Sequence, residues 1–150
     1  MKVLTPDQGL FDGKGKSLFL VGPTPRSTDV SSWRPSAVEI LERLEFNGTV
    51  MVPEPFVGFE KQVEWEYDSL NRCDVIVAWV PRNMQNMISL TTNCEFGFWI
   101  SRDPNRLLYG RPDNAPHMGY LDWMYQKFAH RTPFNQLEPL LTTAILRIDG

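Results

Sequence analysis

The sequence predicts a single α/β domain in which a doubly wound parallel sheet of about four or five strands is flanked by helices. Two apolar runs, at residues 17–21 and 74–81, lack the polar alternation of a half-exposed strand and are typical of central parallel strands. Segments with helical periodicity separate the apolar runs, and this alternation favours a parallel sheet with helices on both faces. A length of 150 residues and a hydrophobic content of 42% are sufficient for one domain with its own core.

We expect residues 1–16 to be a flexible N-terminal segment, because they are rich in Gly, Asp and Lys. Residues 17–150 would then form the single domain. The first strand, at 17–21, stops at Gly22-Pro23, and open α/β sheets bind their ligands beyond strand ends of this kind. The loop that follows carries several hydroxyl groups and one guanidinium, which are groups that bind polar ligands.

The remaining elements are read from helical spacing and from short apolar runs. In order, we expect a helix at 35–44, a strand at 49–53, a helix at 60–72, a strand at 74–81, a helix at 91–100, a strand at 106–110, a helix at 120–128 and a last helix from Leu137. The helix at 60–72 is expected to turn one stripe towards the core, formed by Phe59, Val63, Tyr67 and Leu70. This order of elements is typical of flavodoxin-like and Rossmann-like folds.

The composition argues against several functional classes. The net charge is −3 and the isoelectric point is near 5.4, so general electrostatic binding of a nucleic acid polymer is not expected. Cys73 and Cys94 match no metal-binding spacing and only two His are present, so no metal site is expected. The chain has no apolar signal region and no run of about 18 apolar residues, which leads us to expect a cytoplasmic protein without membrane contact.

Glu95 is the residue around which the candidate chemistry is organised. Thr92-Asn93-Cys94-Glu95 fits the capping box, in which the Thr and Glu side chains satisfy free backbone N–H groups at a helix start. The same position also suits a nucleophile, because the positive end of a helix keeps a partly buried carboxylate ionised. The two roles compete, since a Glu95 side chain folded back onto its own helix cannot reach a ligand. The spacing alone leaves both interpretations open.

Asp74, Trp33 and Trp79 have two interpretations each. Asp74, at the start of a predicted strand, is either a structural acid that ends the preceding helix or a member of the candidate site. Trp33 and Trp79 either fill the core or stack on a flat ligand. The predicted topology brings residues 22–27, the loop after Trp79 and the start of the next helix to one edge of the sheet. A ligand pocket near Glu95 is therefore expected at that edge.

A set of short motifs occurs in order along residues 17–125. The motifs are Leu18-Phe19-Leu20-Val21-Gly22-Pro23, Trp33-Arg34, Gln62-Val63-Glu64-Trp65-Glu66, Cys73-Asp74-Val75-Ile76-Val77-Ala78-Trp79, Thr92-Asn93-Cys94-Glu95-Phe96-Gly97 and Tyr120-Leu121. Together they resemble the nucleoside 2-deoxyribosyltransferase superfamily, particularly its small deoxyribosyltransferase-like and nucleotide N-glycosidase members. The fold of that family agrees with the order of elements predicted above.

The resemblance implies an enzyme that acts on the N-glycosidic bond of (deoxy)nucleosides or their 5′-monophosphates, without a metal or organic cofactor. By position, Glu95 attacks C1′ of the sugar and displaces the base, and Asp74 handles the proton of the leaving base. The deoxyribosyl group then passes to a free nucleobase acceptor or to water, so both a transferase and a hydrolase fit. Substrate binding is expected from Gly22, Pro23, Arg26, Trp33, Trp79, Ser89 and Asn93. The family also implies a homo-oligomer in which a neighbouring copy completes the pocket.

Two positions depart from patterns found in the family. Phe19 stands where many relatives have a Tyr that helps to position the nucleophilic Glu. Ser89 stands six residues before Glu95, where nucleoside transferases commonly have an Asp and nucleotide hydrolases have a Ser. Together with Arg26, Ser89 favours a deoxynucleoside monophosphate as the substrate. Phe19 leaves open a catalytically silent nucleotide-binding module, and a third interpretation is an α/β interaction domain in which Glu95 only caps its helix.

Overall fold

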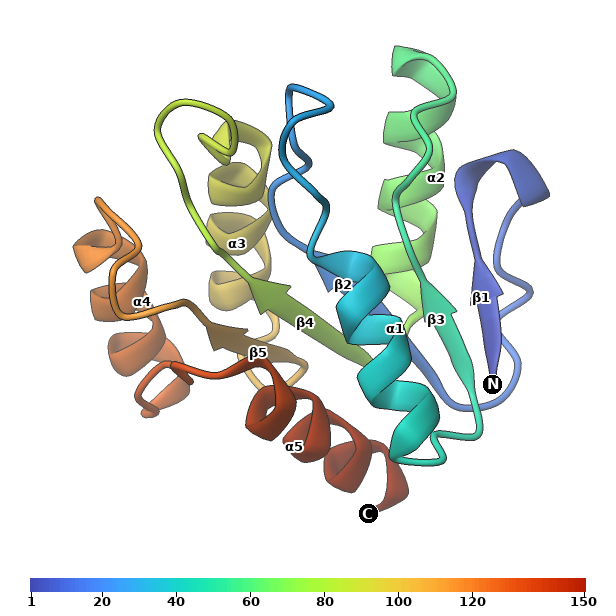
Figure 1. Ribbon diagram of the computed structural model, residues 1–150. Coiled ribbons are helices and arrows are strands. Elements are labelled where there is room, and N and C mark those ends of the chain that lie inside the picture. Colours follow the sequence, from blue (N-terminus) through green and yellow to red (C-terminus); the bar gives the residue numbers. More distant parts are fainter.

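The computed structural model describes residues 1–150 and confirms the α/β doubly wound fold (Figure 1). The elements are, in order, β1 (Lys2–Leu4), a short 3-10 helix (Pro6–Gln8), β2 (Ser17–Val21), α1 (Arg34–Arg43), β3 (Thr49–Met51), α2 (Phe59–Arg72), β4 (Val75–Trp79), α3 (Leu90–Arg102), β5 (Leu107–Gly110), α4 (Gly119–Ala129) and α5 (Leu137–Asp149). None of these helices combines the length and the apolar character needed to cross a membrane.

Five parallel strands form one sheet, in the order β1-β3-β2-β4-β5. The chain moves outward from β2 to β3 through α1, and then crosses back over β2 to β4 through α2. The direction of winding therefore reverses between β2 and β4. The carboxyl ends of these two strands leave a crevice, which is the place where open α/β sheets bind ligands.

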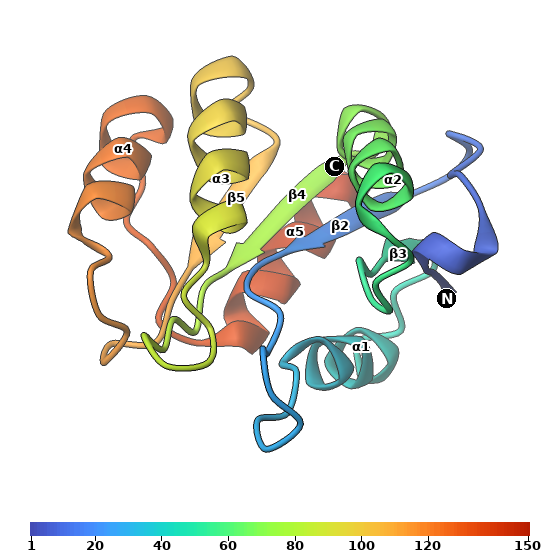
Figure 2. The ribbon, with the colours of Figure 1, turned by 90° about the horizontal axis from the view of Figure 1, so that it is seen from above.

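Helices cover both faces of the sheet (Figure 2). α1 and α5 lie on one face, and α2, α3 and α4 lie on the other. Leu18 and Leu20 of β2 belong to the core beneath α1 and α5. Phe19 and Val21 belong to the core on the opposite face. Both sides of β2 are therefore apolar, which is why this strand forms an unbroken apolar run in the sequence.

Residues 1–16 are part of the domain rather than the flexible segment that their composition predicts. β1 pairs with β3 and adds an edge strand to the sheet. Leu4 and Phe11 are buried. The indole Nε1 of Trp65 on α2 donates a hydrogen bond to the carbonyl of Gly9 at 2.8 Å. These contacts dock the segment against both the sheet and α2.

α2 turns a different face to the core than its apolar spacing predicts. Phe59, Val63 and Tyr67 are exposed by 75%, 48% and 61%, and of the predicted stripe only Leu70 is buried. The buried face instead carries Trp65, whose ring packs against β2. Phe59, Val63 and Tyr67 therefore form a row of large apolar side chains on the exposed surface of α2.

Candidate active site

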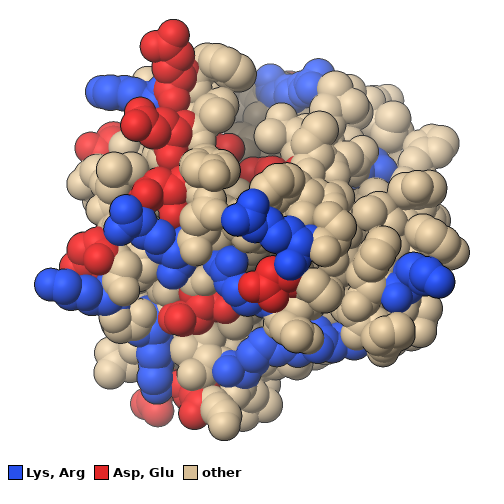
Figure 3. All heavy atoms as spheres, turned by 180° about the vertical axis from the view of Figure 1, so that it is seen from behind, with Lys and Arg blue, Asp and Glu red and all other residues tan.

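A cavity of about 320 Å³ opens at the crevice between the carboxyl ends of β2 and β4. α2 and α3 form two of its sides, and the loops that follow β2 and β3 complete its wall. Figure 3 looks onto the face formed by α2, α3 and α4, and shows the surface hollowed near its upper edge. The polar lining comes mainly from Arg26, Arg34, Gln62, Glu66, Ser89 and Glu95. The apolar wall comes mainly from Phe19, Phe56, Phe59, Val63, Ile88 and Leu90.

α3 begins at Leu90, so Thr92 and Glu95 already lie inside the helix. Ser89 is the N-cap residue, with left-handed backbone angles (φ 71°, ψ 37°), and no side chain caps the helix start. The capping-box interpretation is therefore wrong, because a capping box needs Thr92 at the N-cap itself. Glu95 instead lies on the second turn of α3 and lines the cavity.

The carboxyl group of Glu95 lies in an environment that disfavours its charge. Burial raises the pKa of Glu95 to about 8, the negative charge of Glu66 adds to the increase, and the positive charge of Arg34 opposes it. Glu66 lies on α2 and Arg34 lies on α1, so three helices together set the charge of one group. A carboxyl group with a pKa near neutrality changes its protonation state in the physiological range, which is a common property of catalytic acids.

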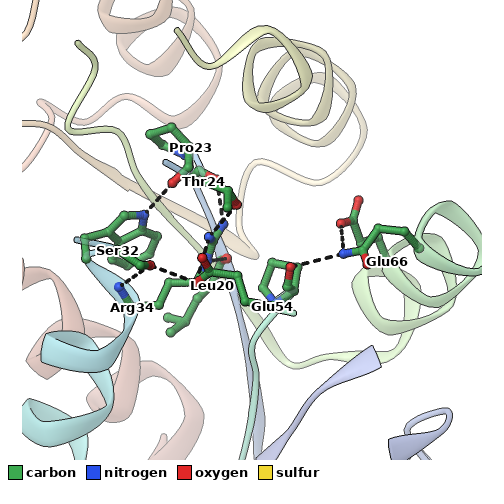
Figure 4. A network of polar contacts seen from close by, with 11 residues as sticks. Leu20, Pro23, Thr24, Ser32, Arg34, Glu54 and Glu66 are labelled. Atoms are coloured by element: carbon green, nitrogen blue, oxygen red, sulfur yellow. Dashed lines mark hydrogen bonds and ion pairs between the residues drawn. The ribbon is translucent and has the colours of Figure 1, made fainter. Parts of the chain in front are cut away.

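Glu66 is the second acid of the cavity. Burial raises the pKa of Glu66, whereas a hydrogen bond from Gln62 and the charge of Arg34 lower it. The amide of Gln62 donates to Oε1 of Glu66 at 2.7 Å and to the carbonyl of Pro53 at 3.1 Å, so the carboxyl is fixed to the chain that follows β3 (Figure 4). The i, i+4 spacing of Gln62 and Glu66 is visible in the sequence, but both residues fall off the apolar stripe from which the core face is predicted.

Arg34, the first residue of α1, is buried and lines the same cavity. Its guanidinium donates hydrogen bonds to the carbonyl of Leu20 at 3.1 Å and to the carbonyl of Gly22 at 2.5 Å. It also donates to Oγ1 of Thr24 at 2.9 Å and lies 3.3 Å from Oε2 of Glu54 (Figure 4). The sequence marks the start of this helix, but no spacing reveals that its first side chain turns towards the sheet.

The structure brings five of the expected site residues to the cavity, namely Gly22, Pro23, Arg26, Ser89 and Glu95. Gly22 is required by close packing, because a Cβ atom there would lie 2.2 Å from the carbonyl oxygen of Trp79. The backbone N–H of Arg26 donates to the carbonyl of Asn86 at 3.0 Å. This bond ties the loop after β2 to the loop before α3, so two walls of the cavity are joined.

Trp33, Trp79 and Asn93 do not line the cavity. Both indoles are buried in the core beneath α1 and α5. Nε1 of Trp33 donates to the carbonyl of Pro23 at 3.2 Å. Oδ1 of Asn93 accepts a hydrogen bond from the guanidinium of Arg82. The two Trp residues therefore belong to the core rather than to a stacking surface, and Asn93 is engaged in holding Arg82.

Asp74 lies at the opposite edge of the sheet, just before the amino end of β4. Its Oδ2 accepts hydrogen bonds from the backbone N–H and the hydroxyl of Ser17, at 2.8 and 3.0 Å. The backbone N–H of Asp74 donates to the same hydroxyl at 3.1 Å, so these bonds join the amino ends of β2 and β4. The structure therefore does not bring Asp74 together with Glu95. Glu66 is the acid that shares the cavity with Glu95.

Comparison with known proteins identifies a family. A family model described as nucleoside 2-deoxyribosyltransferase like matches residues 15–113, which is more than half of the chain. The matched range begins before β2 and ends after β5, so it includes α1, α2, α3 and every residue that lines the cavity. No curated protein gives a significant match. The chain belongs to the nucleoside 2-deoxyribosyltransferase-like family.

Proposed function

We propose that the protein breaks the N-glycosidic bond of a deoxynucleoside or its 5′-monophosphate and passes the deoxyribosyl group to another base or to water. The observation that carries this proposal is the pair of acids, Glu66 and Glu95, in one cavity at the switch point of the sheet. Cleavage of a glycosidic bond through a covalent intermediate needs one carboxylate as the nucleophile and a second group that transfers a proton. Family membership supports a nucleoside as the substrate.

In the first step, the ionised carboxylate of Glu95 attacks C1′ of the sugar. The C1′–N bond breaks, its electron pair leaves with the base, and the base takes a proton from the acid form of Glu66. The product is a deoxyribosyl ester of Glu95. In the second step, a nitrogen of an acceptor base, or water, attacks C1′ while Glu66 takes its proton, and the ester bond to Glu95 breaks.

The raised pKa values of Glu66 and Glu95 support a proton that stays in the cavity near neutral pH, where the second group of the reaction needs it. A carboxyl group that has lost water and lies near a second negative charge holds its proton more tightly than it would in water. Because Glu95 has the higher pKa and is raised by the charge of Glu66, the proton lies mainly on Glu95; the reactive form, with the proton on Glu66 and the negative charge on Glu95, is the minor form of the pair. Arg34, which opposes the increase in both pKa values, stabilises the charged member of the pair.

In this proposal the base rests on the apolar wall of the cavity rather than on Trp33 or Trp79. Phe56 and Phe59 line the cavity with 71% and 75% of their surfaces exposed. Large aromatic side chains that are exposed beside a cavity are suited to a flat partner, because covering them removes apolar surface from water. The substrate base supplies such a partner.

The start of α3 supports a phosphate at the 5′ end of the substrate. No side chain caps this helix, so its first N–H groups are free to bind an anion, and Ser89 and Thr91 line the cavity there. Arg26 adds a positive charge to the same lining. A carboxylate in place of Ser89 would repel a phosphate, whereas a hydroxyl does not.

A homo-oligomer belongs to the same proposal. α2, α3 and α4 form one face of the molecule (Figure 2), and the apolar side chains exposed on these helices include Phe59, Val63, Tyr67, Phe98, Tyr120 and Trp123. Figure 3 shows that charged side chains are sparse over the part of this face formed by α4. A second copy packed on this face would cover the apolar side chains. It would also reach the cavity, because Phe59 and Val63 belong to both surfaces.

The alternative is a nucleotide-binding module without turnover. Phe19 lines the cavity and has no hydroxyl with which to hold the nucleophile, and this observation favours the alternative. The same substrate would bind, but Glu95 would not attack it.

One assay separates the enzyme from the module. The protein is incubated with each deoxynucleoside and each deoxynucleoside 5′-monophosphate, with and without a second base, and free base and new nucleoside are followed by chromatography. We expect base release in the wild type and its loss in Glu95→Gln, which keeps the size of the side chain and removes its charge. Glu64→Gln, on the exposed side of α2, is the matched control.

Binding of the substrate in a calorimeter without release of the base would favour the module. The absence of both binding and release for all deoxynucleosides and monophosphates would contradict the proposed function.

A further inference from the structure

Arg34 is the most deeply buried charged side chain of the protein, with only 2% of its surface exposed. A buried guanidinium is costly unless hydrogen bonds and a counter-charge compensate for the lost water. Arg34 has both, because Leu20 of β2 and Gly22 just after this strand each supply a carbonyl and Glu54 supplies a carboxylate. Its position is therefore defined by the fold, and it does not depend on a bound ligand.

Two loops meet at this guanidinium. Arg34 holds the carboxyl end of β2 through its bonds to main-chain carbonyls, and it holds the loop after β3 through Glu54. Oε2 of Glu54 also accepts a hydrogen bond from the hydroxyl of Ser32 at 2.8 Å. The same β3 loop is joined to Glu66 by Gln62, whose amide donates to the carbonyl of Pro53 and to Oε1 of Glu66. Arg34 and Gln62 thus both hold the loop after β3, Arg34 through Glu54 and Gln62 through the carbonyl of Pro53.

The charge of Arg34 acts on both acids of the cavity. Burial lowers the pKa of Arg34, and Glu54, Glu95 and Glu66 each oppose that decrease. In return, the charge of Arg34 lowers the pKa values of Glu66 and Glu95. Arg26, the other cation of the lining, is exposed, so solvent screens its charge. Arg34 is therefore the buried cation of the cavity lining whose charge acts on both acids.

We propose that Arg34 is the positioning residue of this site, which fixes the loops after β2 and β3 and supplies the positive charge that keeps one of the two acids ionised. The inference rests on the proposed function, because nucleophilic attack requires the charged form of Glu95. It assigns two separable contributions to one side chain, namely the placement of the loops by its planar set of N–H groups and the electrostatic effect of its charge.

The ionisation of Glu95 can be measured without any turnover. The protein is isotopically labelled at the side-chain carboxyl carbons of Glu, and the Glu95 signal is assigned by its absence in Glu95→Gln. Its chemical shift is then followed by NMR over a pH titration. We expect a wild-type midpoint at about 8. In Arg34→Gln, the midpoint is expected to move up by about one pH unit or more, because an opposite charge has been removed.

Two further variants separate charge from geometry. Arg34→Lys keeps the charge and loses the planar set of donors, so we expect a lower melting temperature with a midpoint that stays closer to the wild-type value than that of Arg34→Gln. Arg43→Gln removes a positive charge from an exposed position on the same helix, and its midpoint is expected to match the wild type. A midpoint in Arg34→Gln that equals the wild-type value would overturn the proposal.

Glu54→Gln keeps the proposal testable if Arg34→Gln does not fold. This change leaves the bonds between Arg34 and β2 in place and removes the carboxylate nearest to the guanidinium, so more of the positive charge acts on the cavity. The Glu95 midpoint is expected to move down, and a midpoint that does not move down would overturn the proposal. If the titrations behave as expected but no base is ever released, the proposed function fails while the electrostatic role of Arg34 stands.

Discussion

Glu66 on α2 and Glu95 on α3 line one cavity, and each has a pKa above the ordinary value of a carboxyl group. Burial is the main cause for both residues, and the charge of Glu66 is the second cause for Glu95. Two like charges in one buried site cannot both form easily. The cavity therefore retains a proton at a pH where isolated carboxyl groups have lost theirs.

Base release is expected to follow a bell-shaped pH profile, because Glu95 must be ionised and Glu66 must be protonated in the reactive form. The value of kcat/KM is expected to fall about tenfold for each pH unit on the acid side, where both acids are protonated, and also above pH about 8, where both are ionised. The measurement is the pH dependence of kcat/KM, which reports on the free protein. A rate that does not fall above pH about 8 would contradict the requirement for a protonated Glu66 beside an ionised Glu95.

The folded protein is expected to lose stability as the pH rises from the ordinary carboxyl range through about 8. Glu95 binds its proton more tightly in the folded state than in the unfolded chain, so its contribution is present at low pH and is lost as the proton leaves. The slope for one proton is at most about 1.4 kcal/mol per pH unit. Urea unfolding at several pH values measures this slope. Glu95→Gln has no proton to lose at this position and should show the weaker dependence; identical slopes would contradict the raised pKa.

Glu66→Gln is expected to slow base release roughly a hundredfold, because the leaving base then lacks its proton donor. The same change removes a negative charge that raises the pKa of Glu95, so the pH profile should lose its fall on the alkaline side and rise to a plateau with a midpoint below about 8. Both effects are read from one set of kcat/KM values, with Glu64→Gln as the control on the exposed side of α2. A rate equal to that of the wild type would show that another group handles the proton.

Asp74→Ala is expected to lower stability and to leave base release within about twofold of the wild type. The variant removes the acceptor of two hydrogen bonds from Ser17, which costs about 2 kcal/mol for bonds to a charged group. Urea unfolding and the chromatographic assay measure the two properties on the same sample. Loss of base release in a variant that is folded would restore a catalytic role for Asp74.

Tyr67→Lys is expected to weaken the proposed homo-oligomer, because it places a charge among the exposed apolar side chains of α2. The dissociation constant should rise at least about tenfold, as expected for a residue near the centre of an interface. Leu146→Lys on α5 makes the same kind of change on the opposite face of the sheet and is the control. Sedimentation of both variants gives the comparison, and equal dissociation constants would exclude the α2 surface as the interface.

The central strands could be predicted from the sequence because both of their faces are buried, which leaves an unbroken apolar run. β1 could not be predicted, since it has three residues and only Leu4 among them is buried. Apolar spacing failed to predict which face of α2 packs against the sheet, and the reason is different. The side of α2 towards the sheet carries the polar residues Gln62 and Glu66 beside Trp65, while Phe59, Val63 and Tyr67 remain exposed.

The sequence also limits how well the site can be predicted. The order of motifs places Glu95 correctly at the cavity, but the same motifs include Asp74, which precedes β4 and lies at the other edge of the sheet. A strand of five residues, at about 3.3 Å for each residue, separates those edges by about 17 Å. The direction of a parallel strand could have excluded Asp74 from the pocket, because ligands bind at the carboxyl edge.

Ser89, where the chain enters α3, has a positive φ of 71°. Branched and bulky side chains are disfavoured at such angles, whereas Gly, Asn and Asp, and less readily other small polar residues, are tolerated. The backbone conformation therefore limits which amino acids fit at this position, independently of any ligand. Within this restricted set, Asp and Ser differ by a full negative charge. Under the proposed function, a single exchange between Asp and Ser at this position would change the preferred substrate from one with a neutral 5′ end to one with a 5′ phosphate. The backbone at the start of the helix would not have to change.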